Sequence, residues 1–347
     1  MTNKFVSIRH VAKDAGVSIA TVSRVVNGIT DRAKPETIQR VLQSVEKLDY
    51  RPHSVSRALK MKESRIVGVL VANLGNPSMA AVAGAIEDAL RSQGYVMALC
   101  DTHENEEIQD QYLREMESQL AIAIVMVVAV ESEMLERLRN QKRPIIFVAR
   151  RDPLKKKSSF VGIDDLAAGE TVAKYCIGQG FKTPNVLHAS IEYSAGAMRL
   201  AGIQSAYQRL ESGMKLPTFT SQGINHQEIG YNAARDAMQR APQPDALICL
   251  SDLIAFGAYR WLQENSSAFT RWPRLIGFDD NPLNDWINPW LTSVRCPYQE
   301  LGSAVLLALS DLLADLPAKD YLLPHKLILR NVGSPSCPNP AADLQLR

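Results

Sequence analysis

The sequence lacks several features that would place it in a common class of protein. Its 347 residues contain no apolar run near the roughly 20 residues that a membrane-spanning helix needs. Met1 to Lys4 leads directly into a helical pattern and not into the apolar stretch of an export signal, so we expect a cytoplasmic protein with no membrane partner. The five cysteines are odd in number and far apart, which favours reduced thiols over a disulfide framework or a zinc site.

Motifs for catalysis and cofactor binding are also missing. No Gly-x-Gly-x-x-Gly or Gly-x-x-x-x-Gly-Lys follows an expected strand, which argues against a dinucleotide or nucleoside triphosphate enzyme. The six histidines have no metal-ligand spacing, and no expected strand end gathers a catalytic set. We therefore expect a protein that is not an enzyme and that holds neither a metal nor another cofactor.

Charge is distributed unevenly along the chain. Residues 1–62 hold twelve Lys and Arg against five Asp and Glu, whereas the remaining 285 residues hold 27 against 32. A basic head on an acidic body predicts that the head contacts phosphates. The Lys155–Lys157 run inside the body is interpreted as a solvated loop.

The chain begins with two short amphipathic segments joined at Gly16. Apolar residues recur at helical spacing in both segments: Ile8, Val11, Ala12 and Ala15, then Val22, Val25 and Val26. Ser18 can cap the second helix with its hydroxyl. A third helix from Pro35 is expected to bury a stripe made of Ile38, Val41, Leu42, Val45 and Leu48. The pattern predicts a helix-turn-helix whose second helix enters a DNA major groove, although an ordinary helical hairpin would share the short Gly-containing turn.

From Arg65 the pattern changes to short apolar strands alternating with amphipathic helices. The first series of strands is expected at residues 66–72, 96–100, 122–128 and 144–149, and the second at 160–163, 185–189, 246–250 and 275–278. This alternation predicts two parallel sheets, each with helices on both faces. Ligands of such sheets bind beyond the carboxyl ends of the strands, so the cleft between the two lobes is the expected binding site.

The helix-turn-helix at residues 7–27, the Tyr-x-Pro segment after it and the Ile-Val-Gly-Val-Leu strand at residues 66–70 together resemble the LacI/GalR family of bacterial transcription regulators. The resemblance covers residues 5 to about 333. It implies an α/β fold, with a three-helix head, a hinge helix, and a two-lobed body like that of periplasmic binding proteins. The implied boundaries are 1–50 for the head, 51–63 for the hinge, 64–333 for the body and 334–347 for a flexible tail. Within the body, lobe one would be 64–160 with 294–322, and lobe two 161–293 with 323–333.

The resemblance also implies which residues contact double-stranded operator DNA. Ile19 and Ala20 would distinguish operators through contacts with thymine methyl groups, and Arg24 would read a guanine edge. Leu59 would insert between base steps at the centre of the operator. Residues His53, Ser54 and Ser56 depart from the family's usual hinge pattern. The complete expected set is Ser7, Ser18, Ile19, Ala20, Thr21, Ser23, Arg24, Asn27, His53, Ser56, Arg57, Leu59 and Lys60.

Matching motifs in the body imply a site for a small-molecule effector. Arg199 and Asp279 are the leading ligand contacts, because a guanidinium fork and a carboxylate can hold hydroxyls or an acidic group. Each could instead pair with another charge at a strand end. The other expected contacts are Asn76, Ser78, Met79, Asp165, Asn225, Ser251 and Cys296. A sugar or sugar acid is the expected effector, with a nucleobase or nucleoside as the alternative. Trp286 and Trp290 near the cleft could stack on a sugar ring, but packing is their favoured role.

The function implied is ligand-responsive repression of a sugar or sugar-acid uptake or catabolism operon. A homodimer is expected because one head covers half of a near-palindromic operator, and the proline-rich tail does not support a tetramer. Effector binding would release the operator, although a corepressor or an activator would have the same sequence features. A periplasmic binding protein would lack the head, and a sugar kinase would need phosphate-binding glycines.

Overall fold

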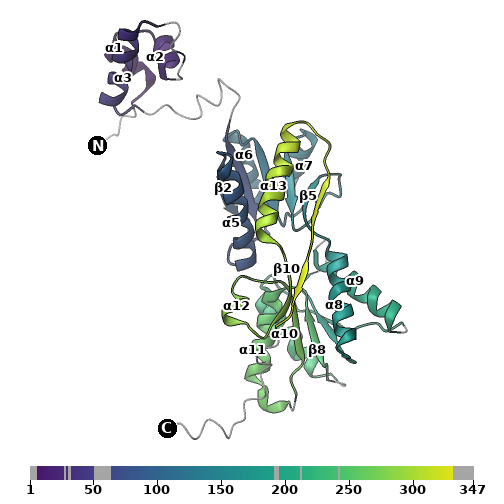
Figure 1. Ribbon diagram of the computed structural model, residues 1–347. Helices are drawn as coiled ribbons and strands as arrows, with labels where there is room; N and C mark the ends of the chain where they lie inside the picture. Colours follow the sequence, from purple (N-terminus) through teal and green to yellow (C-terminus); the bar gives the residue numbers. More distant parts are fainter. Residues whose placement is uncertain are drawn as a thin grey trace, which may run out of the picture. The chain divides into compact units, whose positions relative to one another are not determined.

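A computed structural model describes residues 6–26, 29, 33–50, 64–190, 195–211, 213–240, 243–269 and 271–330. The chain divides into two compact units, Met1–Ser64 and Arg65–Arg347, which we call the head and the body (Figure 1). Among the described residues, none of the helices combines the length and the apolar character required to cross a bilayer.

The head contains three described helices, α1 (Ile8–Ala15), α2 (Ile19–Val26) and α3 (Pro35–Lys47). Gly16 turns the chain after α1 with a φ of 63°, and its N–H bonds to carbonyl oxygens in the last turn of that helix. Side chains with a Cβ are strained at this angle, which explains why glycine occupies the turn. An ion pair of 2.7 Å between Lys47 Nζ and Asp14 Oδ1 links α3 to α1.

A small apolar core holds the three helices together. Its buried members are Val11, Ala12, Ala15, Val22, Val25, Val41 and Tyr50. Ile38, Val45 and Leu48 are partly buried against them, as their spacing predicts. Leu42 is 51% exposed, so the prediction that it joins this stripe is wrong. Among the described residues of the head, the buried members of this core do not include it.

The first lobe of the body is a six-stranded parallel sheet in the order β11-β5-β4-β3-β1-β2. Its strands are β1 (Ile66–Val71), β2 (Val96–Asp101), β3 (Ala123–Val127), β4 (Ile145–Val148), β5 (Ser159–Ile163) and β11 (Asp320–Leu323). Helices α5 (Pro77–Ser92) and α13 (Tyr298–Leu313) cover one face, and α6 (Glu106–Ser118) and α7 (Glu133–Asn140) cover the other. Successive residues of β1 point to opposite faces, so Val69 packs under α5 and Leu70 packs under α6.

The second lobe repeats this architecture in the order β12-β10-β9-β8-β6-β7, with only β12 antiparallel to its neighbour. Its strands are β6 (Asn185–Leu187), β7 (Thr218–Phe219), β8 (Ala246–Cys249), β9 (Arg274–Asp279), β10 (Thr292–Arg295) and β12 (Lys326–Ile328). Its helices are α8 (Asp165–Gly178), α9 (Ala195–Leu210), α10 (His226–Met238), α11 (Asp252–Glu264), a 3-10 turn (Ser266–Ala268) and the short α12 (Asn284–Ile287). Helices α8 and α9 cover one face of the sheet, and α10 and α11 cover the other.

The chain passes between the lobes three times, after β5, after β10 and after β11 (Figure 1). The strand at residues 159–163, which we expected to begin the second series, belongs to the first sheet, where Phe160 lies opposite Phe147 of β4. The predicted lobe boundaries at 160 and 294 therefore fall inside β5 and β10. An apolar run predicts a buried strand, but it does not say which sheet that strand joins.

Candidate functional site

One side of α2 exposes both apolar and charged side chains on the surface of the head. Ile19, Ala20 and Arg24 are exposed, while Val22 and Val25 on the other side of the helix are buried. The Ser18 hydroxyl accepts a hydrogen bond of 3.1 Å from the Thr21 N–H, so it caps the helix as its position in the sequence predicts. The free N-terminal end of α2 therefore has the arrangement that a recognition helix needs.

The other expected DNA contacts divide into two groups. Ser7 begins α1, where its backbone N–H donates to His10 Nδ1 at 3.0 Å, and Thr21 and Ser23 are half-buried on α2. The remaining positions lie outside the described residues: Asn27, His53, Ser56, Arg57, Leu59 and Lys60.

A cavity of about 70 Å³ lies where the chain crosses between the lobes. Its described lining consists of Asn76, Ser78, Met79, Val82, Val127, Ala149, Gly162, Ile163, Asp165, Arg199, Asp279, Cys296, Tyr298 and Leu301. Seven of the nine expected effector contacts belong to this lining. An adjoining groove of about 980 Å³ shares Ala149, Ile163 and Asp165 with the cavity. Small-molecule sites usually have at least about 300 Å³, so a sugar-sized ligand would need part of this groove as well.

Arg199 lies at the centre of the polar lining. Its Nε donates to Asp165 Oδ1 at 2.8 Å, and its Nη1 donates to Asp279 Oδ1 at 3.3 Å and to the Leu250 carbonyl at 2.9 Å. Its guanidinium also lies 4.8 Å from the centre of the Phe278 ring. The close packing of α8 and α9 makes these contacts possible, because a Cβ on Gly169 would meet the Arg199 carbonyl oxygen at 2.1 Å.

Burial and charge shift the pKa values of these groups. Burial raises the pKa of Asp165 and that of Asp279, and the nearby Arg199 only partly opposes this rise. Burial alone would lower the pKa of Arg199, but Asp165 and Asp279 raise it, so the guanidinium stays charged. Burial raises the pKa of the Cys296 thiol to about 12, which keeps it a neutral thiol. The cavity thus holds one cation between two carboxylates.

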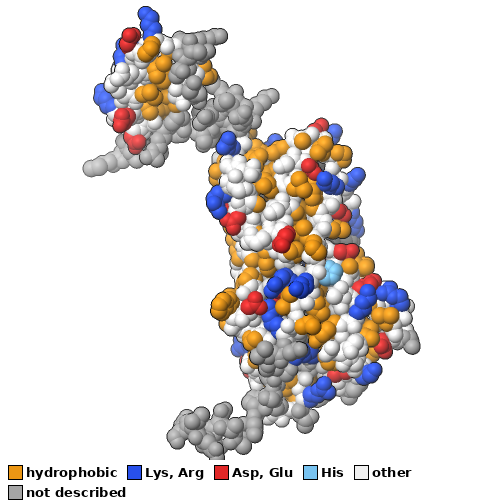
Figure 2. All heavy atoms as spheres, in the orientation of Figure 1, with side chains coloured by type: hydrophobic (Ala, Val, Ile, Leu, Met, Phe, Trp, Pro, Cys, Tyr) orange, Lys and Arg blue, Asp and Glu red, His pale blue; other side chains and the backbone are white. Residues whose placement is uncertain are grey.

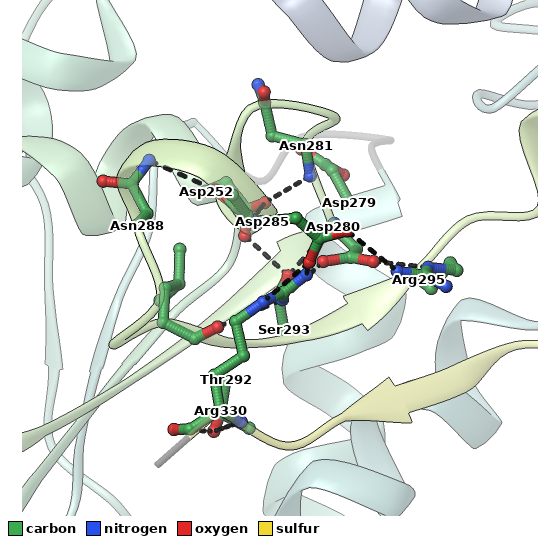
Figure 3. A network of polar contacts seen from close by, with 12 residues as sticks. Asp252, Asp279, Asp280, Asn281, Asp285, Asn288, Thr292, Ser293, Arg295 and Arg330 are labelled. Carbon is green, nitrogen blue, oxygen red and sulfur yellow. Dashed lines mark hydrogen bonds and ion pairs between the residues drawn. The ribbon is translucent and has the colours of Figure 1, made fainter. Parts of the chain in front are cut away.

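Asp252, at the start of α11, lies behind Asp279 and is fully buried (Figure 3). Its Oδ2 accepts from the Asn281 N–H and from Asn284 Nδ2, both at 2.7 Å, and its Oδ1 accepts from the Ser293 hydroxyl at 2.6 Å. Gly277 has no side chain beside it, since a Cβ there would meet Asp252 Oδ1 at 2.2 Å. Burial, and then repulsion by Asp279, raise the pKa of Asp252.

A second group of charges continues from this cluster through Asp280 (Figure 3). Asp280 accepts from Arg330 Nη1 at 2.6 Å and from Arg295 Nε at 2.5 Å. Arg330 also pairs with Asp285 in the α12 segment and donates to the Leu291 carbonyl at 3.3 Å. The segment that follows β9 is therefore fixed by buried charges on one side and by Asp252 on the other.

The backbone is strained where this segment leaves the sheet. Asp279 and Asp280 have φ values of 108° and 49°, which side chains with a Cβ rarely adopt, and Ala149 at the end of β4 has a φ of 61°. Asp279 and Ala149 both line the cavity. The surrounding hydrogen bonds hold this strained backbone in place and so fix the direction of the Asp279 carboxylate.

Two of the expected effector contacts cap helices and lie outside the described lining of the cavity. The Asn225 side chain accepts from the N–H groups of Gln227 and Glu228 and so caps α10, whereas the Ser251 hydroxyl accepts from the Ile254 N–H and caps α11. Neither residue belongs to the described cavity lining. Asn and Ser are the residues that helix starts favour, and the sequence alone does not separate capping from ligand contact.

Sequence reasoning missed Tyr298, whose hydroxyl donates to the Asp279 carbonyl at 2.8 Å. It is the first residue of α13 and follows Cys296 by two positions, so its place after a strand end was the available signal. Trp290 packs as expected, with its ring 4.0 Å from that of Tyr259 in a stacked arrangement. Trp286 is 84% exposed, so the prediction that it packs within this chain is wrong.

Comparisons with known proteins agree with this architecture. A family model described as bacterial regulatory proteins of the lacI family matches residues 7–53, and one described as periplasmic binding proteins and sugar binding domain of the LacI family matches residues 64–273. The HTH-type transcriptional regulator RegA of Clostridium saccharobutylicum is 29% identical over 329 residues, covering 93% of this chain and 98% of RegA.

Two solved structures share the fold over nearly the whole chain. The lac repressor dimer bound to operator and an anti-inducer has a TM-score of 0.78 at 21% identity, covering 94% of this chain and 98% of the repressor chain. The complex of the regulator CelR with cellobiose has a TM-score of 0.68 at 23% identity, covering 94% of this chain and 100% of CelR. At these identities the likeness is one of fold.

Proposed function

Because the chain belongs to the LacI family of bacterial regulatory proteins, we propose that it is a ligand-responsive transcriptional regulator that binds operator DNA as a homodimer. Its effector would occupy the cavity between the lobes, and its target would be an operon for uptake or catabolism of a sugar or sugar derivative. The favoured mode of regulation is repression that the effector relieves. Repression with a corepressor, or activation of transcription, would use the same DNA-binding head and the same cavity.

The exposed first turn of α2 is the observation that supports DNA binding most directly. Ile19 and Ala20 are apolar and exposed on a basic head. Exposing apolar side chains to water does not stabilise an isolated domain, so a partner surface is the expected reason for their exposure. In a major groove the two side chains can contact thymine methyl groups, while Arg24 reaches a guanine. Thr21 and Ser23 at the sides of the helix suit contacts with phosphates.

The cavity supports a role for a small ligand, because it brings groups from both lobes together. Asn76 and Ser78 come from the start of α5 in the first lobe, and Arg199 and Asp279 come from the second. A ligand that contacts both sets binds one relative position of the lobes more tightly than another, and this difference shifts the equilibrium between them. The cellobiose bound by CelR is consistent with a sugar as ligand.

Exposed apolar side chains on the body support the homodimer. Trp286, Ile287 and Leu283 of the α12 segment are 84%, 63% and 43% exposed, and the hydrophobic cluster protrudes at the place of α12 in Figure 2. Val96 and Leu99 on the edge strand β2 are 60% and 41% exposed. Edge strands and large side chains of this kind are usually covered, and a second copy bound through a two-fold axis would cover them.

Replacing Trp286 with Glu is therefore expected to weaken the dimer by about 2 kcal/mol or more, which is roughly a thirtyfold rise in the dissociation constant. Sedimentation equilibrium of the full chain measures this change. Leu210→Glu is the matched control, because Leu210 is 49% exposed at the end of α9, on the opposite side of the second lobe from α12 (Figure 1). Equal effects of the two substitutions would contradict a dimer built on the α12 surface.

DNA binding is tested by selecting duplexes from a randomised near-palindromic library with the full chain. The affinity for the selected duplex should fall at least about a hundredfold between roughly 50 and 200 mM salt, because each Lys or Arg on a phosphate releases counterions. A variant that starts at residue 61 keeps the acidic body and should lose this binding. Equal retention of the duplex by both proteins, or no selected sequence at all, would refute the proposed function.

A further inference from the structure

The groove that adjoins the cavity is much larger than the cavity and takes its lining from both lobes. Its lining residues fall in segments 151–160 and 318–322 of the first lobe, and in segments 164–166 and 195–198 of the second. We call the part of the groove that these segments line, and that the cavity does not share, the outer groove. The whole groove has a volume of about 980 Å³. An effector that took about 300 Å³ of it would leave more than half of it open.

The outer groove is lined by exposed cations, which are Arg151, Lys155, Lys156, Lys157 and Lys319. Three of them, Arg151, Lys156 and Lys319, each pair with one carboxylate, at 2.8, 3.3 and 2.7 Å. Their side chains are 58%, 41% and 56% exposed, and ion pairs at such exposure are weak, so an incoming anion can compete for these cations. Among the described residues, none forms an ion pair or a hydrogen bond with the Lys157 ammonium. The run of lysines at 155–157 is therefore exposed, as the sequence predicts, but it also borders a groove.

The carboxylates of the groove lining offset these cations only in part. Asp152 and Asp165 have side chains that are 3% and 10% exposed, and each pairs with a largely buried arginine that is not in the groove lining. The two other carboxylates of the lining, Asp164 and Asp320, are exposed. The first turn of α9 also belongs to the lining and contains no acidic residue, so the positive end of its dipole adds to the potential of the cations. Five exposed cations thus face two exposed carboxylates, which makes the outer groove suitable for an anion.

The outer groove also exposes apolar side chains from both lobes. Met198 in the first turn of α9 is 47% exposed, and Leu322 of β11 is 50% exposed. Both residues line the groove together with Phe160 and Leu166. The Arg151 guanidinium lies 4.3 Å from the centre of the Phe160 ring, which places a cation directly beside an apolar surface. A ligand that covers the apolar side chains can therefore bring an acidic group to the cations without leaving the groove.

We propose that the outer groove is a second ligand site, which binds an organic acid with an apolar body, of the kind of an aromatic carboxylate. The apolar body contacts Met198 and Leu322, and the carboxylate lies beside Arg151 and Lys157. Because the acid contacts both lobes next to Asp165, which also lines the cavity, it stabilises the position of the lobes that forms the groove. This site goes beyond the proposed function and does not depend on the identity of the effector.

Compounds that share one apolar skeleton test the charge and the apolar body separately, with the full chain. The two sets are phenylbutyrate, phenylbutanol and phenylbutylamine, and naphthaleneacetate, naphthaleneethanol and naphthaleneethylamine. Acetate supplies the charge without the apolar body. Calorimetry measures the affinities, and at least one acid should bind at least about tenfold more tightly than its alcohol, its amine and acetate. An alcohol or amine that binds as tightly as its acid, or failure of both acids to bind, would overturn the proposal.

Two single substitutions show whether the acid binds in the outer groove. Lys157→Glu reverses the charge of a cation at the groove and should weaken binding of the acid at least about tenfold. Leu322→Ser removes apolar contact and should weaken it at least about fivefold. Lys142→Glu and Leu307→Ser are the matched controls, because both residues are exposed, belong to the first lobe and lie outside the described lining of the groove. All four side chains lie at the surface, so each variant should fold.

Unchanged affinity for the acid in both Lys157→Glu and Leu322→Ser, or equal losses in the two controls, would place the acid elsewhere and overturn the proposal. Raising the salt concentration from about 50 to about 500 mM should weaken binding of the acid, because salt screens exposed cations. If neither acid binds while the chain still selects a duplex, the outer groove is not a ligand site and the proposed function stands. If duplex selection fails, the regulator itself is wrong, whatever the groove binds.

Discussion

Replacing Arg199 with Met is expected to destabilise the body by about 3–5 kcal/mol near neutral pH. The substitution leaves Asp165 and Asp279 without their cation, although both are largely buried, with side chains 10% and 19% exposed. Methionine keeps apolar contact with the Phe278 ring, so the loss reports the charge more than the packing. Urea unfolding of the full chain, followed by the signal of the body, measures the difference.

Arg209→Met provides a matched control on the same helix. Arg209 pairs with Glu170 at 3.3 Å, but its side chain is 53% exposed, so removing it should change the stability by no more than about 1 kcal/mol. Adding Asp165→Asn to Arg199→Met should restore part of the lost stability, because it removes one of the two carboxylates without a cation. Equal losses for Arg199 and Arg209, or no recovery in the double variant, would contradict this account of the cluster.

The loss caused by Arg199→Met should also shrink as the pH falls. Burial already raises the pKa values of Asp165 and Asp279 while the Arg199 guanidinium is present. Removing the guanidinium should raise both pKa values further, because its positive charge opposes the rise. A carboxyl whose pKa is raised in the folded state stabilises that state at low pH, and this stabilisation is lost as the pH rises through the raised pKa. We therefore expect a smaller difference from the unsubstituted chain at about pH 5 than at about pH 8.

Much of the fold could be predicted from the sequence, because local patterns determine it. The turn at Gly16 and the cap at Ser18 follow from the backbone and hydrogen-bonding chemistry of those residues alone. The strands and helices of the body follow from apolar periodicity, and the fold class is confirmed by the two parallel-dominated sheets and by the matching family models. The strand at 159–163 was placed in the wrong series, because sheet membership depends on pairing over long distances.

The partners of the cavity residues could not be predicted in the same way. Arg199 is 34 positions from Asp165 and 80 from Asp279, so no local pattern links them. The sequence left open whether Arg199 holds a ligand or another strand-end charge, and the structure shows two such charges on it. The sequence drew attention to Ser251, whereas the fully buried side chain is that of its neighbour Asp252. A polar residue at a helix start gives no periodic signal of burial.

Replacing Asp252 with Leu should also destabilise the body by about 3–5 kcal/mol. The substitution leaves the Asn281 N–H, Asn284 Nδ2 and the Ser293 hydroxyl without their acceptor, in a region where all three residues are almost fully buried. Each unsatisfied buried donor costs about 1–3 kcal/mol, and relaxation recovers part of the sum. Urea unfolding measures the change in stability. The loss should persist at low pH, because these three donors do not titrate.

Asp252→Asn separates the hydrogen bonds of this residue from its charge. The amide oxygen can accept from Asn281 and Asn284, and the amide nitrogen can donate to the Ser293 oxygen, so the variant should stay within about 1 kcal/mol of the unsubstituted chain at about pH 5. At about pH 8 it should be the more stable protein, because burial and Asp279 raise the pKa of Asp252 and make its charged form unfavourable there. If Asp252→Asn were instead as unstable as Asp252→Leu at both pH values, the negative charge itself would stabilise the segment after β9, and the raised pKa of Asp252 would be refuted.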